Sequence, residues 1–297
     1  MPMFKRILRI IWKIVLIFIS LIFVLLRSWA IYSWFKDSDK QLLKKLQTID
    51  PNAKILYHMS PKWYTLRYAE LGVSWADTVM LIYGTPGNIL DWENVLTQTD
   101  ILKKYHVIIP DRPWFGRSMK WHAMTNIQEQ WDLLAELLPL SWSGNKMTLV
   151  WRSYAWALIP YIAATNTWTV KSTVVIAGTM DPASQTIWLI TYPLHYTPLR
   201  RIIPSMLRVT DAEKLASEKQ LDTIMPLREN IIAPTYLLHG KKDWIVQPAN
   251  SLFAQKMLKN AKVFYESIEW IGHEIPIAMP EKVYSAIKTV DTYSWNK

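Results

Sequence analysis

The chain has 297 residues, a formal net charge of +10 and no cysteine. Without cysteine, disulfide frameworks, thiolate nucleophiles and zinc–sulfur sites are excluded. Nine Lys and Arg residues but only two Asp lie in residues 1–45, so the rest of the chain carries a net charge of only +3. Because this basic excess flanks an apolar segment and no nucleic-acid-binding motif accompanies it, we expect a membrane as partner and no nucleic acid.

An uncharged apolar run extends from Ile14 to Leu26, preceded by four cations and closed by Arg27. If the helix begins near Ile7 and the early cations reach back to the headgroups, the segment has roughly 20 residues, enough to cross a bilayer. We predict a single-pass membrane anchor at residues 1–30. Because the cations precede the run, we expect a cytoplasmic N-terminus and an extracytoplasmic domain. A cleaved secretory signal is the alternative, although the bulky Trp29 stands where a cleavage site needs small residues.

Residues 31–50 are charged and helical in pattern, which is typical of a short stalk. The chain then changes to β-rich runs, which predict strands at Lys54–His58, Tyr64–Glu70, Thr78–Tyr83, His106–Pro110, Met147–Val150, Thr173–Ala177, Thr235–His239 and Val263–Ile268. Helical stretches are expected at Asp91–Lys104, Asn126–Leu138, Tyr154–Ala164, Ser251–Leu258 and Glu281–Thr289. An antiparallel-looking start followed by strand–helix alternation predicts an α/β domain over residues 51–297. Its mostly parallel, twisted sheet of about eight strands should carry helices on both faces.

The sixth and seventh predicted strands are separated by about 55 residues, far more than a simple crossover requires. Residues 181–230 in this interval are helical in pattern and rich in proline and aromatic side chains. Ligands of parallel sheets bind at the carboxyl ends of the strands. We therefore predict that an insertion after the sixth strand, about residues 181–230, forms a lid over those ends.

A strand, a tight turn around a serine and a helical start occupy residues 147–157, Met-Thr-Leu-Val-Trp-Arg-Ser-Tyr-Ala-Trp-Ala. This segment resembles the nucleophile elbow of the α/β-hydrolase family, where a strained strand-to-helix turn raises a serine above the sheet. A serine hydroxyl needs a base to accept its proton and a third group to orient that base. The resemblance implies Ser153 as nucleophile, Asp243 after the seventh strand as acid and His273 after the last strand as base. Asp181, after the sixth strand, is the alternative acid.

Two further segments carry the resemblance, which covers roughly residues 55–290. Leu-Ile-Tyr-Gly-Thr-Pro-Gly-Asn at residues 81–88 resembles the family's His-Gly oxyanion loop, with Tyr83 in place of the histidine. Pro86 has no N–H, so the resemblance implies the backbone amides of Thr85 and Tyr154 as oxyanion donors. Asp-Arg-Pro-Trp-Phe-Gly-Arg-Ser at residues 111–118 resembles a structural turn after the family's fourth strand.

Several positions that hold glycine in the family hold tryptophan here. The family elbow has small residues two positions before and after the serine, because strand, turn and helix approach closely. Here these two flanking positions hold Trp151 and Ala155, with Trp156 next, and Trp114 and Trp270 stand at two further positions where the family has glycine. The chain has 17 Trp and 8 Gly, whereas roughly 20 Gly would be usual. We hypothesise that a codon written as Trp, UGA being the obvious candidate, specifies Gly in the source organism, because the elbow as written should not close properly.

The resemblance implies a membrane-anchored serine hydrolase that cleaves an ester, thioester or amide through an acyl-enzyme intermediate, without cofactor or metal. The expected substrate is a small-molecule or lipid-like acyl compound. Serine at position 153, where the dehalogenase and epoxide-hydrolase branches have aspartate, argues against those activities. Two alternatives stay open. One is a catalytically inactive binding protein with this fold, and the other is a cofactor-independent enzyme that performs acyl transfer or carbon–carbon cleavage.

Overall fold

The computed structural model describes residues 2–36, 38–118, 124–141, 146–154, 163–184, 191–196, 200 and 205–295. One sheet contains eight strands in the order β1-β2-β4-β3-β5-β6-β7-β8. The strands are β1 (Lys54–Met59), β2 (Thr65–Gly72), β3 (Thr78–Ile82), β4 (His106–Pro110), β5 (Met147–Arg152), β6 (Val170–Ile176), β7 (Thr235–Gly240) and β8 (Val263–Ile268). Only the β1–β2 and β2–β4 pairs are antiparallel. The antiparallel start and the mostly parallel sheet are therefore confirmed.

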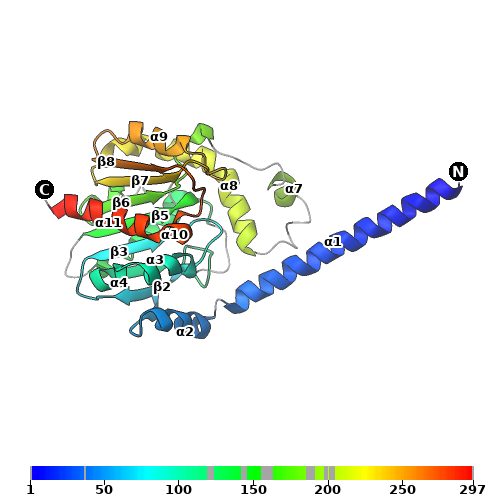
Figure 1. Cartoon of the computed structure of the whole chain (residues 1–297), viewed down its shortest axis with the longest axis horizontal. Helices are drawn as coiled ribbons and strands as arrows, with labels where there is room; N and C mark the ends of the chain where they lie inside the picture. The colour runs from blue at the N-terminus through cyan, green and yellow to red at the C-terminus, as the bar shows by residue number, and fades with distance from the viewer. Residues whose placement is uncertain are drawn as a thin grey trace.

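Helices surround this sheet, and one long helix extends away from it (Figure 1). The α-helices are α1 (Pro2–Lys36), α2 (Asp39–Ile49), α3 (Glu93–Gln98), α4 (Ile101–Lys104), α5 (Ile127–Ala135), α7 (Thr191–Tyr196), α8 (Ser205–Ile224), α9 (Ala249–Met257), α10 (Ile275–Ala278) and α11 (Pro280–Trp295). Short 3-10 turns are η1 (Ile89–Trp92), η2 (Leu138–Leu140), η5 (Pro182–Ser184) and η7 (Met225–Asn230). Four of these elements, η5, α7, α8 and η7, lie between β6 and β7, where the sequence predicts an insertion.

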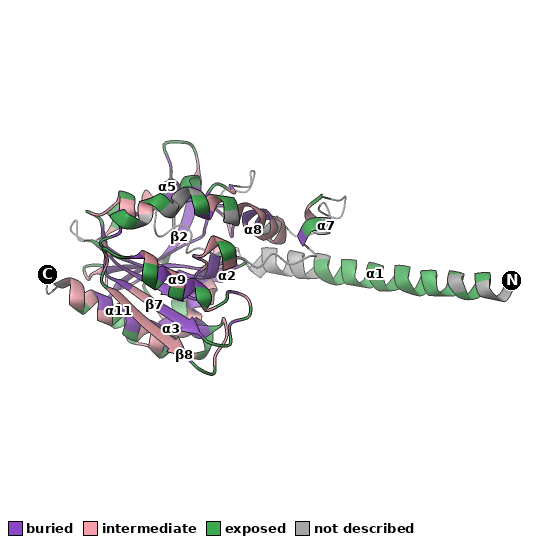
Figure 2. Ribbon diagram, turned by 90° about the horizontal axis from the view of Figure 1, so that it is seen from above, coloured by how far each residue is buried: buried purple, intermediate pink, exposed green. Residues whose placement is uncertain are grey.

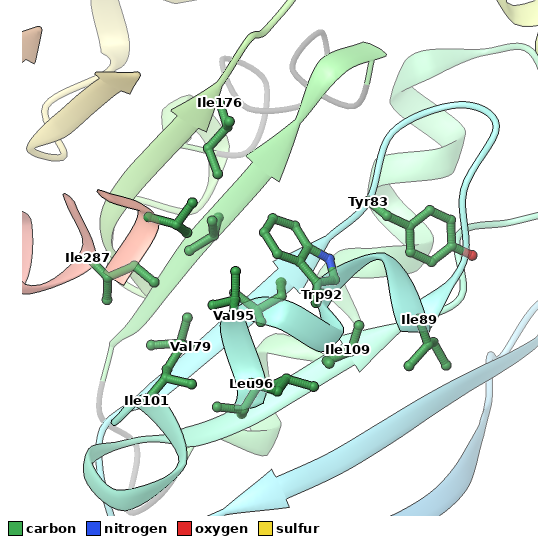
Figure 3. Close-up of a cluster of buried hydrophobic side chains, with 14 of the residues drawn as sticks. Val79, Tyr83, Ile89, Trp92, Val95, Leu96, Ile101, Ile109, Ile176 and Ile287 are labelled. Atoms are coloured by element: carbon green, nitrogen blue, oxygen red, sulfur yellow. The ribbon is translucent and has the colours of Figure 1, made fainter. Parts of the chain in front are cut away.

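The sheet separates two apolar cores, and the alternation along its strands shows why. Val79 and Leu81 of β3 belong to the core under α2, α3 and α11, whereas Met80 and Ile82 belong to the core under α5 and α9. Successive side chains of a strand point to opposite faces, so a strand buried on both faces must be apolar throughout. Figure 3 shows the first of these cores, with Trp92 among its aliphatic side chains. Helices on both faces are thus confirmed.

Helix α1 contains the apolar segment Lys5–Leu26, 22 residues with a mean hydropathy of 2.6 and none of it buried. At 1.5 Å per residue this segment is about 33 Å long, which matches the hydrocarbon thickness of a bilayer. Length and composition therefore qualify α1 as a membrane span, as the sequence predicts. Figure 2 shows its exposed surface projecting from the domain.

Helix α2 occupies most of the interval that the sequence assigns to a stalk, and it packs against the domain. Its N-cap Ser38 accepts a hydrogen bond from the Gln41 amide, and Leu42 and Leu46 on one face are completely buried. Apolar side chains one turn apart lie on the same face of a helix, so both enter the core together. Residues 39–49 are therefore part of the folded body.

Two predicted elements differ from the observed ones. The single helix predicted over Asp91–Lys104 is wrong, because Thr99 is extended (φ −130°, ψ 169°) and separates α3 from α4. Strand β6 begins three residues before its predicted start. Lys171 interrupts the apolar pattern there, but its ammonium group is satisfied by Asp77 at 2.9 Å and Asp291 at 2.5 Å. The predicted helix 154–164 lies largely outside the described residues.

Candidate active site

Ser153 follows the last residue of β5 at the carboxyl edge of the sheet, the edge at which the parallel strands end. Its φ angle is 60°, in the left-handed region that is costly for a residue with a side chain. Strained backbone of this kind persists only where the surroundings impose it, and it concentrates at functional positions. The turn geometry expected of a nucleophile elbow is therefore present at Ser153.

The loop after β3 lies against this turn. A Cβ atom added to Gly84 would lie 2.7 Å from the Cβ of Ser153 and 3.1 Å from the carbonyl oxygen of Arg152. Such distances are too short for any side chain, so glycine is required where the two loops meet. Thr85 and Tyr154, the predicted oxyanion donors, line one small cavity together with Ser153.

Asp243 and His273 form a hydrogen-bonded pair in the loops after β7 and β8. The His273 Nδ1 atom lies 2.7 Å from the Asp243 Oδ2 atom, and the Asp243 carboxylate is completely buried. Burial raises the pKa of Asp243, but hydrogen bonds with His239 and His273 and from the Val246 amide hold it well below its usual range. Asp243 is therefore ionised, Nδ1 of His273 donates to it, and Nε2 is left to accept a proton.

Backbone contact between the two loops holds this pair in place. A Cβ atom at Gly240 would lie 2.4 Å from the carbonyl oxygens of both Ile271 and Gly272. Only glycine at position 240 allows the end of β7 to pass so close to the chain before His273. The pairing of acid and histidine thus depends on packing between main-chain segments and not only on the side chains.

The alternative acid, Asp181, takes part in a different set of hydrogen bonds. Its carboxylate accepts from the Ala183 amide at 3.0 Å and from the Ser184 hydroxyl at 2.5 Å, which caps the turn η5. The structure therefore places Asp243, and not Asp181, against His273. Among the described residues no hydrogen bond joins the Ser153 hydroxyl to His273. Catalytic hydrogen bonds are often long in a protein without substrate.

Arg112 connects the oxyanion loop to helix α8. Its guanidinium group donates to the Gly84 carbonyl at 3.1 Å, to Gln130 at 3.0 Å and to Glu213 of α8 at 2.6 Å. The side chains of Arg112 and Glu213 are both completely buried. A buried charge is tolerated only when it is paired and hydrogen-bonded. The position of α8 is therefore tied to that of the loop beside Ser153.

The cavity at Ser153 has a volume of about 30 Å³, roughly that of one water molecule. Helix α8 contributes Lys214 and Ser217 to its wall. Burial lowers the pKa of Lys214. The hydroxyl groups of Tyr154 and Thr179 are buried and lack hydrogen-bond partners in the described part of the chain. Unpaired buried hydroxyls beside a candidate nucleophile are suitable partners for a polar group of a bound molecule.

Arg152, directly before Ser153, bridges three loops. Its guanidinium group pairs with Glu274, the residue after His273, and lies 3.8 Å from Asp91, just beyond the oxyanion loop. Burial raises the pKa of Asp91 to about 6, although Arg152 opposes this effect. Sequence reasoning overlooked this cluster. The sequence did contain a signal for it, because a charged residue stands directly beside each candidate, Arg152 before Ser153 and Glu274 after His273.

The tryptophans at family glycine positions behave differently from one another. Trp114 has a φ angle of 79°, which favours glycine, and Trp270 is 70% exposed. Trp151, in contrast, is completely buried and its ring lies 6.0 Å from that of Trp131. In this structure the Trp151 indole packs in the core under α5 while Ser153 adopts the left-handed turn, so the expectation that Trp151 prevents the elbow from closing is not met. Trp156 lies outside the described residues.

No protein-family model and no curated protein matches this sequence. Solved structures do match it in fold. A membrane phospholipase A, described as a bacterial virulence factor, is 19% identical, with a TM-score of 0.63 over 95% of this chain and 99% of that one. A carboxylesterase from Nitrososphaera gargenis is 17% identical, with a TM-score of 0.62 over 81% of this chain and 99% of that one.

A haloalkane dehalogenase from Bradyrhizobium elkani is also similar, at 17% identity and a TM-score of 0.58 over 82% of this chain and all of that one. The dehalogenase is named for a different reaction from the phospholipase and the carboxylesterase, so the similarity concerns the scaffold that all three share. The mostly parallel eight-stranded sheet, the strained serine turn after β5 and the acid and histidine loops after β7 and β8 agree with that scaffold. The chain has the α/β-hydrolase fold.

Proposed function

We propose that the chain is a membrane-anchored serine hydrolase that cleaves an ester, thioester or amide. Ser153 attacks the carbonyl carbon, His273 accepts the serine proton through Nε2, and Asp243 holds the imidazole in the required tautomer. The observation that carries the proposal is the buried Asp243–His273 pair, at 2.7 Å, on the same sheet edge as the strained turn at Ser153.

The proposed reaction has two stages. In the first, the serine oxygen forms a bond to the acyl carbon while the proton on His273 moves to the leaving group, which departs. In the second, His273 takes a proton from water while the water oxygen attacks the acyl carbon. The bond between the acyl carbon and the serine oxygen then breaks, the acid leaves, and His273 returns the proton to Ser153. The amides of Thr85 and Tyr154 are the proposed donors to the negatively charged oxygen in both stages.

The similar enzymes support an acyl substrate but do not select one, since fold alone fixes no chemistry. Serine at position 153 agrees with the phospholipase and carboxylesterase chemistry named for two of them. Carbon–halogen cleavage in this fold uses a carboxylate nucleophile, which the turn after β5 lacks. The second candidate function is an inactive binding protein. The absence of a Ser153–His273 hydrogen bond among the described residues favours it.

A fluorophosphonate probe separates the two candidates, because only an activated serine reacts with it. We expect labelling of the full chain in detergent, and no labelling of Ser153→Ala. Hydrolysis of p-nitrophenyl butyrate should fall by at least about 10⁴-fold in Ser153→Ala and His273→Ala. Ser184→Ala is the matched control, since it removes another hydroxyl from the same cavity. Full activity of Ser153→Ala would refute the mechanism, and no labelling of the wild type would favour the binding protein.

Membrane anchoring through α1 is part of the proposal. The full chain should stay with membranes after washes with high salt and with carbonate, whereas a chain that starts at Ser38 should be soluble and fold independently, because α2 packs within the domain. Release of the full chain by salt alone would contradict the anchor. We also propose an extracytoplasmic domain, which protease added to intact cells should digest.

A further inference from the structure

Helix α2 runs from the carboxyl edge of the sheet to the opposite, amino edge. At its start, the Asp39 carboxylate accepts a hydrogen bond from Arg67 at 2.9 Å, and Arg67 also donates to Asp111 at 2.5 Å. Asp111 directly follows β4, so this start lies at the carboxyl edge. At its end, Asp50 accepts from the Gly72 amide at 2.7 Å, and Gly72 pairs with the first residue of β4.

The apolar helix joins the domain at this same edge. Helix α1 ends at Lys36 and α2 begins at Asp39 after its N-cap Ser38, so only residue 37 lies between the last turn of α1 and the cap. Three residue steps span at most about 11 Å. Because α2 is fixed by its buried leucines and by the Asp39–Arg67 pair, the end of α1 is held close to the edge that carries Ser153.

The distance from the bilayer to the domain is also short. Helix α1 continues for ten residues beyond the apolar segment that ends at Leu26, which is about 15 Å. The headgroup layer on one side of a bilayer takes about 6 Å of this length. The distance between the membrane surface and the carboxyl edge of the sheet is therefore about one helix diameter.

The helices between β6 and β7 lie on this side of the domain as well. Both views show α7 and α8 on the side from which α1 extends, away from the C-terminal end of α11 (Figures 1 and 2). His195 of α7 pairs with Asp211 of α8 at 2.6 Å, and α8 carries Lys214 to the cavity at Ser153. Tyr192 and Tyr196 of α7 are 45% and 75% exposed, as suits side chains at a membrane interface.

The exposed tryptophans do not indicate which edge of the sheet faces the membrane. Trp63 and Trp244 lie at the carboxyl edge, but the equally exposed Trp75 and Trp168 lie in the turns before β3 and β6, at the amino edge. The side of the domain that faces the bilayer is therefore set by α2, by the short junction before it and by α7, whose positions are independent of the tryptophans.

We propose that the carboxyl edge, together with α7 and α8, faces the bilayer that holds α1, and that the substrate is an acyl ester that reaches Ser153 from that bilayer. The substrate part of this inference rests on the proposed function. The orientation part does not, and the experiments separate the two.

The C-terminal helix provides a control, because it ends at the opposite edge. Asp291 of α11 pairs with Lys171, the second residue of β6, and the Tyr293 ring packs 5.6 Å from that of Phe264, the second residue of β8. An anchor attached after α11 would therefore present the amino edge to the bilayer. Moving residues 2–36 to follow residue 297 keeps the same helix and the same domain but attaches the helix, now through its basic end, at the amino edge.

Two esters with one leaving group test the substrate part. Each protein is reconstituted in phosphatidylcholine–phosphatidylglycerol vesicles and given 4-methylumbelliferyl oleate, which stays in the bilayer, or the butyrate, which is soluble in water. We expect butyrate rates within twofold of each other, and an oleate rate at least tenfold higher for the native order than for the reversed one. Equal oleate rates would overturn the bilayer as the source of substrate. If neither protein hydrolyses butyrate or labels with fluorophosphonate, the proposed function fails instead.

Fluorescence tests the orientation without any activity. The chain has no cysteine, so single cysteines can be labelled at Lys62→Cys, in the exposed β1–β2 turn at the carboxyl edge, and at Lys259→Cys, exposed before β8 at the amino edge. Energy transfer to a headgroup-labelled lipid should be greater from position 62 than from position 259. A flexible insertion of about 20 residues before Ser38 should make the two positions equal. Equal or reversed transfer in the native chain would overturn the orientation.

Discussion

The two halves of the candidate site are held in different ways. At the acid–histidine end, Asp243 accepts from two backbone amides and from His273, and the loops after β7 and β8 are in main-chain contact. At the nucleophile end, Ser153 sits in strained backbone, and the hydroxyl of Tyr154 is buried without a partner among the described residues. The first half is complete within itself, whereas the second depends on α8, through the Arg112–Glu213 pair, and on whatever fills the cavity.

This difference indicates that the two halves have different roles, one rigid and one that responds to a ligand. A fully satisfied polar cluster in a low-dielectric environment is rigid, and it fixes the orientation of the imidazole before substrate arrives. A half with unpaired groups changes its interactions when a ligand binds. We therefore expect substitutions at the acid–histidine end to affect mainly the rate of reaction, and those at the nucleophile end to affect stability as well.

After the loss of Ser153 or His273 themselves, the largest effect should come from Asp243→Asn. Loss of the carboxylate that fixes the imidazole tautomer should lower kcat by about 10³ to 10⁴-fold, as measured with p-nitrophenyl butyrate. Asp181→Asn is the control, because it changes a carboxylate in the loop after β6 that caps the turn η5, and it should remain within about fivefold of wild type. If Asp181→Asn is inactive and Asp243→Asn is not, the acid has been assigned to the wrong residue.

Next in size should be the effect of Glu213→Gln on stability. This change leaves the buried Arg112 guanidinium without its charged partner, and breaking a buried ion pair costs about 3–5 kcal/mol of unfolding free energy. Urea denaturation of the soluble domain measures it. The exposed pair between Lys103 and Asp100 is the control, since Lys103→Gln should leave the unfolding free energy nearly unchanged. Equal effects of the two substitutions would show that α8 does not stabilise the nucleophile end.

Two tryptophans at family glycine positions should respond to different extents. Trp151→Gly removes a completely buried indole and should cost about 3–5 kcal/mol, whereas in Trp114→Gly the relief of a left-handed backbone, about 1 kcal/mol, offsets part of the packing lost against the two cores, so the cost should be smaller. Thermal or urea unfolding distinguishes the two. Peptide masses from the native protein test the codon hypothesis directly, and tryptophan at both positions would reject it.

A smaller effect than those of Glu213 and Trp151, and one that depends on pH, is expected at Asp91. Burial raises the pKa of Asp91 to about 6, above its ordinary value of 3.8, so the folded chain binds this proton more tightly than the unfolded chain. The contribution of Asp91 to stability is therefore greatest at low pH and decreases as the pH rises from about 4 to 6. Asp91→Asn should increase the unfolding free energy at pH 7 by about 1–3 kcal/mol and change little near pH 4. An equal change at both pH values would contradict the raised pKa.

The sequence predicts the parts of this molecule that depend on local pattern. Apolar runs locate the strands because a strand buried on both faces must be apolar at every position. Ser153, Asp243 and His273 follow three parallel strands, β5, β7 and β8, and this places all three at one edge, since parallel strands end together. The same reasoning predicts the insertion between β6 and β7 from its length alone.

Contacts between distant charged residues could not be predicted in this way. Arg112 and Glu213 are 101 residues apart, and Arg152 and Glu274 are 122 apart, so no local pattern links them. The position of the Trp151 side chain could not be predicted from the sequence either. Whether a large side chain at the elbow enters the turn or the core depends on which face of β5 it occupies and on the space left beside Trp131.

The sheet order has a consequence for synthesis of the chain on the ribosome. Strand β5, which leads into Ser153, pairs with β3 and β6, and both of these are made well before β7 and β8. The main-chain contact at Gly240 that sets Asp243 against His273 needs residue 272, near the end of the chain. A nascent chain held by α1 therefore carries Ser153 without its proposed base until residue 273 has been made, and a chain that terminates before that residue should be inert.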